Sequence, residues 1–166
     1  MKFRTLVSST YLLLALVSVG STLAATPPPI TLQYVNPAKF TDFKVLGRDA
    51  NFTAGRFSEA VREELTPIMK QKYPNGSLVL RFTDIDLAGR YSTGRDVRIM
   101  SLGHPARMSF EFQLTDSNGK VLARGSTRLN DNSNPSSQKY DPKRSQPFYY
   151  ERRALNRWLR TLAVSK

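Results

Sequence analysis

Alternation of apolar and polar residues predicts strands along much of this chain. In residues 77–85, Leu78, Leu80 and Phe82 share one side, and polar or smaller residues take the other. This two-residue period is typical of a strand with one buried face. The alternation recurs in residues 107–114, and the Asn-Gly pair of Asp116–Gly119 favours a tight hairpin turn after which residues 120–129 return as the partner strand. The predicted strands cover residues 31–35, 77–85, 97–100, 107–114 and 120–129.

Two further segments have helical rather than strand spacing. From Arg56 onward, apolar residues recur every three or four positions, which predicts an amphipathic helix. Pro67 lies inside this pattern, and we expect a kink or break near Thr66 because proline lacks a backbone N–H group. A second amphipathic helix is predicted over residues 148–163. The apolar positions are Phe57, Val61, Leu65, Ile68 and Met69 in the first helix, and Leu155, Trp158, Leu159 and Leu162 in the second.

The order of these elements predicts an α+β fold in one domain over residues 31–166. We expect a largely antiparallel sheet of four or five strands with the two amphipathic helices packed on it. Residues 130–147 are rich in Asn, Ser, Pro and charged side chains. They predict a long, mobile polar loop.

The N-terminal residues 1–25 have the pattern of a cleavable secretory signal. Two basic residues precede an apolar stretch, and a small-residue segment ends in Ala24 and Ala25. The alternative is a membrane anchor, but the apolar stretch is shorter than a span of about 20 residues and contains Ser8 and Ser9. Residues 26–30 contain three consecutive prolines and predict an extended tether. The sequence therefore predicts an exported, periplasmic protein that is soluble after cleavage.

Composition narrows the classes of function. Hydrophobic residues make up 40% and charged residues 23% of the 166 positions, which is typical of a globular protein. There is no cysteine, so disulfides, thiol nucleophiles and cysteine-bound zinc are excluded. The net charge is +12. Without Lys2 and Arg4 of the signal, 23 basic residues face 13 acidic ones, and such a field attracts polyanions.

Four segments resemble signatures of a bacterial family, domain of unknown function 3016 (DUF3016). The resemblance implies an exported protein, and because no activity or ligand is established for the family, no functional residue is carried over from it. The stretch after Asp131 departs from the family pattern by being longer and richer in Ser and Asn. The four segments are Tyr34–Asp42, Leu80–Gly89, Asp96–Met100, and Tyr150–Arg152 together with Trp158.

The C-terminal segment concentrates positive charge. Between Lys139 and Lys166 there are eight basic residues and only two acidic ones. Helical spacing places three arginines in one stripe opposite the apolar face. We predict that this helix binds a lipid headgroup, an anionic cell-wall polymer or an acidic protein; the alternative is a solvated helix face. Nucleic acid is disfavoured by export. The predicted binding residues are Arg152, Arg153, Arg157 and Arg160.

Asp84 and Asp86 end the clearest strand as an Asp-x-Asp pair. The strand period puts both carboxylates on one face, where they can share a hard cation or act as an acid and base pair. The alternative is structural ion pairing with nearby arginines, and this is the interpretation that the sequence favours. The arginines in question are Arg81, Arg90, Arg95 and Arg98.

His104, the one histidine, lies in a turn-like Gly-His-Pro setting and is interpreted as a loop residue. No nucleophile elbow, P-loop or dinucleotide-binding glycine motif is present, and no cofactor is predicted. The sequence thus favours a non-enzymatic binding protein that acts through the basic helix. A cation-dependent enzyme or metal-binding domain centred on Asp84 and Asp86, and a structural accessory of an envelope assembly, are the alternatives.

Overall fold

The computed structural model describes residues 29–45, 47–91, 98–101, 103–131 and 141–164. The predicted signal, most of the predicted tether and the centre of the predicted polar loop lie outside these residues. Within the loop region, the sheet runs on to Asp131, and residues Pro142–Ser145 form a short 3-10 helix, η2.

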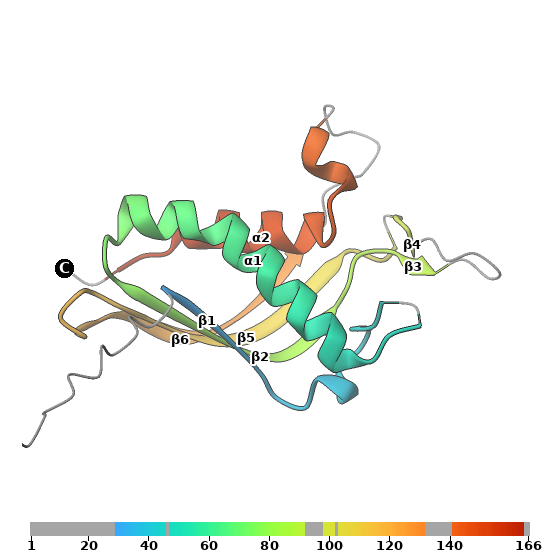
Figure 1. The fold of residues 1–166 in the computed structure, drawn as a ribbon, viewed down its shortest axis with the longest axis horizontal. Helices are drawn as coiled ribbons and strands as arrows, with labels where there is room; N and C mark the ends of the chain where they lie inside the picture. The colour runs from blue at the N-terminus through green and yellow to red at the C-terminus, as the bar shows by residue number, and fades with distance from the viewer. Residues whose placement is uncertain (1–28, 46, 92–97, 102, 132–140, 165–166) are drawn as a thin grey trace, which may run out of the picture.

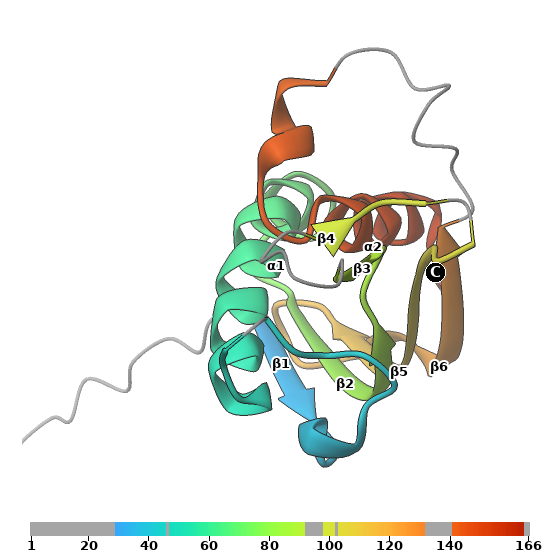
Figure 2. The same ribbon diagram turned by 90° about the vertical axis from the view of Figure 1, so that its right-hand side faces the viewer.

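Two helices cover one face of a four-stranded sheet (Figures 1 and 2). The helices are α1 (Ala50–Lys72) and α2 (Tyr149–Thr161). Two short strands, β3 (Arg90–Tyr91) and β4 (Arg98–Ile99), pair beside the main sheet, and a 3-10 helix, η1 (Pro37–Lys39), follows the first strand. The α+β class is as predicted. The main sheet has the order β1 (Ile30–Tyr34), β2 (Ser77–Asp86), β5 (Ala106–Thr115) and β6 (Val121–Asp131).

The sheet is mixed: most of its pairings are antiparallel, as predicted, but the first strand is added in parallel. Strand β1 runs parallel to β2, with Ile30 opposite Leu78, whereas β2, β5 and β6 are antiparallel. The cause is the long helix between the first two strands. Helix α1 carries the chain back to the end where β1 began, so β2 starts beside it and runs in the same direction.

Helix α1 is longer than predicted and is not broken at Pro67. It begins at Ala50, where the side chain of Asp49 accepts a hydrogen bond from the backbone N–H of Phe52 at 2.7 Å. This is the usual way in which an aspartate caps a helix. Pro67 removes one intrahelical hydrogen bond, whose acceptor would be the carbonyl of Glu63. Glu63 lies on the exposed face, so water can satisfy this carbonyl and the helix continues to Lys72.

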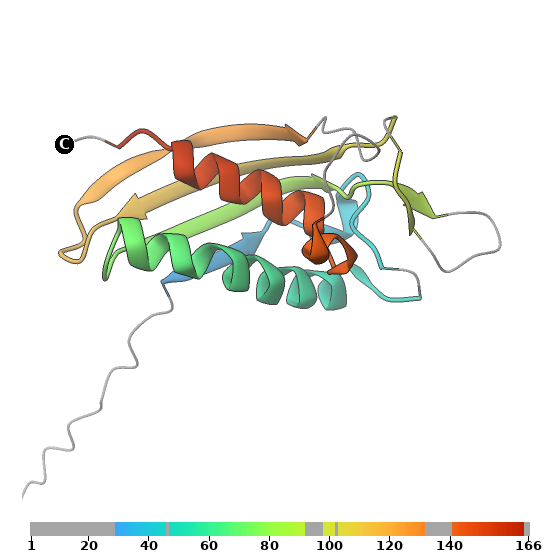
Figure 3. The ribbon, with the colours of Figure 1, turned by 90° about the horizontal axis from the view of Figure 1, so that it is seen from above.

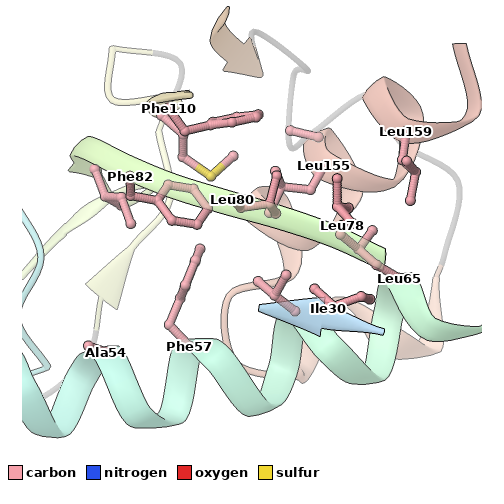
Figure 4. Packing of buried hydrophobic residues seen from close by; sticks show 14 of the residues in the cluster. Ile30, Ala54, Phe57, Leu65, Leu78, Leu80, Phe82, Phe110, Leu155 and Leu159 are labelled. Atoms are coloured by element: carbon pink, nitrogen blue, oxygen red, sulfur yellow. The ribbon is translucent and has the colours of Figure 1, made fainter. Parts of the chain in front are cut away.

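The core lies between the sheet and the two helices (Figure 4). The alternating residues Leu78, Leu80 and Phe82 of β2 are fully buried and meet Phe57 of α1 and Leu155 of α2. Each such side chain contributes roughly 1.5–3 kcal/mol by its burial. The predicted amphipathic faces are therefore the faces that pack on the sheet.

Helices α1 and α2 lie side by side and run in the same direction (Figure 3). Both C-terminal ends therefore lie at the same end of the molecule, together with the β5–β6 hairpin (Figure 1). The opposite end contains the N-terminal ends of both helices, η2 and the β3–β4 pair. These two ends differ in their charge.

Candidate functional site

Arg152 lies between the helices rather than on an exposed stripe. The residue is 5% exposed. Its Nη2 lies 3.1 Å from Glu64 Oε2 of α1, and its Nη1 donates to Gln146 Oε1 at 3.0 Å. Asn156, one turn later, donates to the other oxygen of Glu64. Arg152 and Asn156 therefore join α2 to α1, and this position gives Arg152 no access to a large external surface.

Arg153 and Arg157 both face a buried carboxylate. Asp131, at the end of β6, has a side chain that is 1% exposed. Its Oδ1 lies 3.4 Å from Arg153 Nη2 and 3.0 Å from Arg157 Nη2. The guanidinium of Arg153 also lies over the ring of Tyr149, 5.7 Å from its centre. These two arginines fix α2 to the sheet, so part of the predicted basic stripe is used within the protein.

Arg160 is the exposed member of the predicted set that pairs with no described carboxylate. Its Nε donates to Asn156 Oδ1 at 2.7 Å, and its carbonyl accepts from Lys72 Nζ at 2.7 Å. Because Lys72 is at the end of α1, this contact brings together the basic residues of both helix ends. The positive charge at the end of α2 is therefore continued by lysines at the end of α1.

We call this part of the molecule the basic end. The segments that form it are residues 69–77, 114–124 and 160–164, which lie together on the left of Figure 1. They contain one acidic residue, Asp116, which accepts hydrogen bonds from its own hairpin. Within the described parts of the chain, none of the exposed basic residues here is ion-paired. These residues are Lys70, Lys72, Lys120, Arg124 and Arg160.

The sequence reasoning missed most of the basic end because its members are distant along the chain. Lys70 and Lys72 close α1, whereas Lys120 and Arg124 flank the β5–β6 turn. A signal was present, since each pair lies next to a predicted element end with few acidic neighbours. This signal could be recognised as one surface only when the topology showed that the end of α1 lies beside the β5–β6 hairpin.

Asp84 and Asp86 have separate partners. A register shift between Phe82 and Asp84 interrupts the strand just before them. The Asp84 carboxylate accepts from the backbone N–H and the hydroxyl of Thr41, at 2.8 and 2.9 Å. Asp86 is 3% exposed, and its oxygens lie 3.0 Å from Arg90 Nη1 and 3.3 Å from Arg107 Nη1.

A third carboxylate, Asp42, completes this group. Its Oδ2 pairs with Arg98 Nη2, and with Arg90 Nη1 at 3.1 Å. We call the whole group the arginine–aspartate cluster; it consists of Asp42, Asp86, Arg90, Arg98 and Arg107. The arrangement favours structural ion pairing. In the part of the chain that the structure describes, no three histidine, cysteine, aspartate or glutamate side chains are gathered to hold a metal ion.

His104 occupies an exposed turn. Its Nδ1 lies 3.0 Å from the hydroxyl of Ser101, and its carbonyl accepts from the backbone N–H of Gly89 at 2.8 Å. These contacts hold the segment before β5 against the segment after β2. They give the imidazole a position in the turn and no carboxylate partner among the described residues.

Glu151 is a buried acid that the sequence analysis counted only as a charge opposing the basic helix. It is 2% exposed, and its Oε1 accepts from the backbone N–H of Ala88 at 2.7 Å. Burial raises the pKa of this carboxyl above its ordinary value, and hydrogen bonds from the backbone N–H groups of Ala88 and Glu151 itself partly oppose the rise. Its place at the start of α2, beside β3 and β4, was not evident from the sequence.

Among the described residues, no helix has the length and apolar character needed to cross a membrane.

The chain matches the family described as "Protein of unknown function (DUF3016)" over residues 28–161. The match spans nearly all of the described fold, so the chain belongs to this family, as the resemblance of its four segments predicts. No curated protein matches it. A solved structure, a minor lipoprotein from Acinetobacter baumannii, is similar at 14% identity and a TM-score of 0.31, over 79% of this chain and 85% of that chain. A similarity this loose supports no inference about function.

Proposed function

We propose that this chain is an exported, non-enzymatic binding protein that contacts an anionic lipid surface of the bacterial envelope through its basic end. The secretory pattern of residues 1–25 supports export. The observation that carries the proposal is the segregation of charge. Five exposed cations without carboxylate partners lie where both helices end, beside a single acidic residue, whereas the other acids of the described chain lie among the remaining basic residues, and most arginines there face an acid.

The physical basis is Coulomb attraction between several cations and a surface of phosphate groups. Each Lys or Arg near an anionic membrane contributes about 1 kcal/mol, and the attraction falls off within a Debye length. Exposed lysines and arginines keep this attraction because no neighbouring carboxylate cancels it. Arg160 retains the role that the sequence predicts for it, and the contributions of Arg153 and Arg157 are reduced because Asp131 pairs with both.

Vesicle binding tests the proposal. The purified protein is titrated with vesicles containing phosphatidylglycerol and, separately, with neutral phosphatidylcholine vesicles, at low and high salt. We expect binding to the anionic vesicles alone, falling steeply with salt. The triple variant Lys72→Gln, Arg124→Gln, Arg160→Gln removes three of the exposed cations, so its affinity should fall roughly 100-fold.

A charge-matched variant controls for net charge. Lys44→Gln, Arg56→Gln, Lys143→Gln removes the same charge from exposed residues outside the basic end, and we expect it to lose less than a tenth as much affinity. Equal losses in the two triple variants would show that overall charge, and not the basic end, governs binding. Unchanged affinity in the first variant would contradict the proposal.

The cation-dependent alternative has less support. The carboxylates of Asp84 and Asp86 are engaged by Thr41 and by arginines, which leaves them poorly placed to share a cation. The alternative of a structural accessory makes a different prediction from ours, since it requires a protein partner and little affinity for lipid.

A further inference from the structure

A cavity of about 300 Å³ lies at the end of the molecule opposite the basic end. It is partly open to solvent and is lined by residues of the β3–β4 pair, of η2 and of the first turn of α2, elements that gather at the end facing the viewer in Figure 2. Its volume is at the lower end of the range for small-molecule sites. The walls are largely apolar and aromatic; they include Leu87, Ala88, Tyr91, Met100, Phe148 and Tyr150.

Arg98 brings an incompletely used cation to this cavity. Its Nε donates to the carbonyl of Ala88 at 2.9 Å, its Nη2 pairs with Asp42, and its guanidinium lies 5.0 Å from the ring centre of Tyr91. Its Nη1 is buried and has no hydrogen-bond partner among the described residues. Buried donors are rarely left in this state, so the charge of this guanidinium is incompletely compensated by the protein.

The charge around Arg98 also favours an anion. The arginine–aspartate cluster contains three guanidinium groups and two carboxylates, so one positive charge is not matched within it. Glu151 is a further acid on which Arg98 acts, and its burial favours the neutral form. The charged groups that act on Glu151 are Arg98 of β4 and Asp131 of β6. A ligand with one negative charge would complete the balance of the cluster.

The backbone beside the cavity is held in an unusual conformation. Phe148, which precedes α2, has φ of 57° and ψ of 31°, in the left-handed region that aromatic residues seldom occupy. Its ring packs edge-on against Phe57 at 5.2 Å, which fixes this conformation from the core. Such conformations gather at ligand sites, where the surrounding structure maintains them.

We propose that this cavity binds a small molecule with an apolar body and a single carboxylate group, whose charge is balanced by the guanidinium of Arg98 in the cavity wall. The aromatic and aliphatic walls contact the apolar body. The carboxylate is the form of anion that a guanidinium group matches in both charge and planar geometry. This site is separate from the basic end, so the protein would bind a small carboxylate in addition to the anionic lipid surface of the proposed function.

Calorimetric titration with octanoate and with 3-phenylpropionate tests the proposal, and the neutral alcohols of the same carbon skeletons serve as controls. We expect saturable binding of at least one acid with a stoichiometry of one, and at least tenfold weaker binding of its alcohol. Two probes are used because an aliphatic and an aromatic body fill the cavity differently. Absence of binding by both acids, or equal affinity for acid and alcohol, would overturn the proposal.

Two variants locate the site. Arg98→Met keeps the aliphatic stem and removes the donor, so affinity for the acid should fall at least tenfold while affinity for the alcohol changes little. Met100→Trp fills the cavity without touching the arginine–aspartate cluster, and it should abolish binding of both, whereas Met100→Leu should not. If Arg98→Met fails to fold, the Met100 pair and the ratio of acid to alcohol decide the question.

The basic-end triple variant separates this proposal from the proposed function. It should bind the small acid as tightly as the unmodified protein does, because its three substitutions lie far from the cavity. Loss of acid binding in that variant would show that octanoate or 3-phenylpropionate is attracted by the general positive charge, and the cavity would then have no part in the binding.

Discussion

At the end that contains the cavity, buried carboxylates are matched by arginines or by backbone N–H groups; at the basic end, exposed cations have no carboxylate partner among the described residues. Asp86, Asp131 and Glu151 are each at most 3% exposed, and each has a specific partner. A buried carboxylate requires such partners because its removal from water is costly. The cations of the basic end remain in water and need none.

This difference teaches that the number of basic residues on a helix does not measure the positive charge it presents. Helix α2 carries four arginines in its predicted binding set, yet Arg152 pairs with Glu64, and Arg153 and Arg157 pair with Asp131. Acids on α1 and β6, distant in sequence, cancel most of the stripe. The unmatched cations of the basic end come from three separate segments.

Helix dipoles account for part of the basic end. The parallel arrangement of α1 and α2 puts two negative dipole ends there, which favours Lys70, Lys72 and Arg160 (Figure 3). Lys120 and Arg124 belong to a hairpin and have no such explanation. Their presence is the reason that we assign the basic end a role in binding rather than in helix stability alone.

Among substitutions that should affect one end of the molecule and leave the other unchanged, we expect Gly89→Ala to cause the largest loss of stability. Gly89 has φ of 74°, and an added Cβ would lie 2.4 Å from the carbonyl oxygen of Ile99. The strained backbone and the displaced β4 should lower the free energy of unfolding by about 3 kcal/mol. Urea denaturation measures the loss, and vesicle binding at the other end should be retained.

Gly55→Ala is the matched control. Gly55 lies on the exposed side of α1, with no heavy atom within 4 Å of an added Cβ. Alanine is the better helix former, so stability should rise by about 0.5–1 kcal/mol. If Gly89→Ala were equally harmless, the close approach of β3 to β4 that shapes the cavity would be contradicted.

The second effect concerns the buried acid that holds α2. Asp131→Asn removes the negative charge between Arg153 and Arg157, and we expect a loss of about 2 kcal/mol in the free energy of unfolding. The loss is moderate because both arginines can still reach water. At the basic end, Lys70→Gln should change stability by less than about 0.5 kcal/mol. Similar losses for the two substitutions, measured by urea denaturation, would remove the distinction between the ends.

The smallest effect is a dependence on pH at Glu151. Because burial raises the pKa of the folded carboxyl, the unfolded chain loses its proton first. The stability that Glu151 contributes is therefore complete below the ordinary glutamate pKa and is lost as the pH rises through the raised, folded pKa. Glu151→Gln does not titrate, so its stability relative to the unmodified protein should increase over that range.

Urea denaturation of the unmodified protein and of Glu151→Gln is measured across the same pH range. A Glu151→Gln variant whose relative stability stayed constant with pH would contradict the raised pKa.

Local patterns in the sequence predict much of this fold. Alternation identified β2 and β5, the Asn-Gly turn placed the β5–β6 hairpin, and helical spacing identified the buried face of α2. The parallel pairing of β1 was missed, although a strand, a long helix and a second strand are typical of it. The start of α1 was missed because residues 50–55 have no clear apolar period. The side chain of Asp49 caps the helix there and lets it begin at Ala50.

The candidate sites were harder to predict because they depend on contacts between distant segments. Ion pairing of Asp86 with Arg90 follows from their closeness in sequence. The pairing of Asp131 with α2, and the contact of Lys72 with Arg160, join residues that local spacing cannot relate. The cavity is lined by residues from four separate segments of the chain, so no local sequence pattern predicts it.

The central claim is that the two ends bind different anions independently. The most direct test measures both phosphatidylglycerol vesicles and the small carboxylate against two proteins, the basic-end triple variant and Met100→Trp. The account predicts that the triple variant loses vesicle binding alone and that Met100→Trp loses carboxylate binding alone. If either variant lost both activities to the same degree, the separation of the two ends would be contradicted.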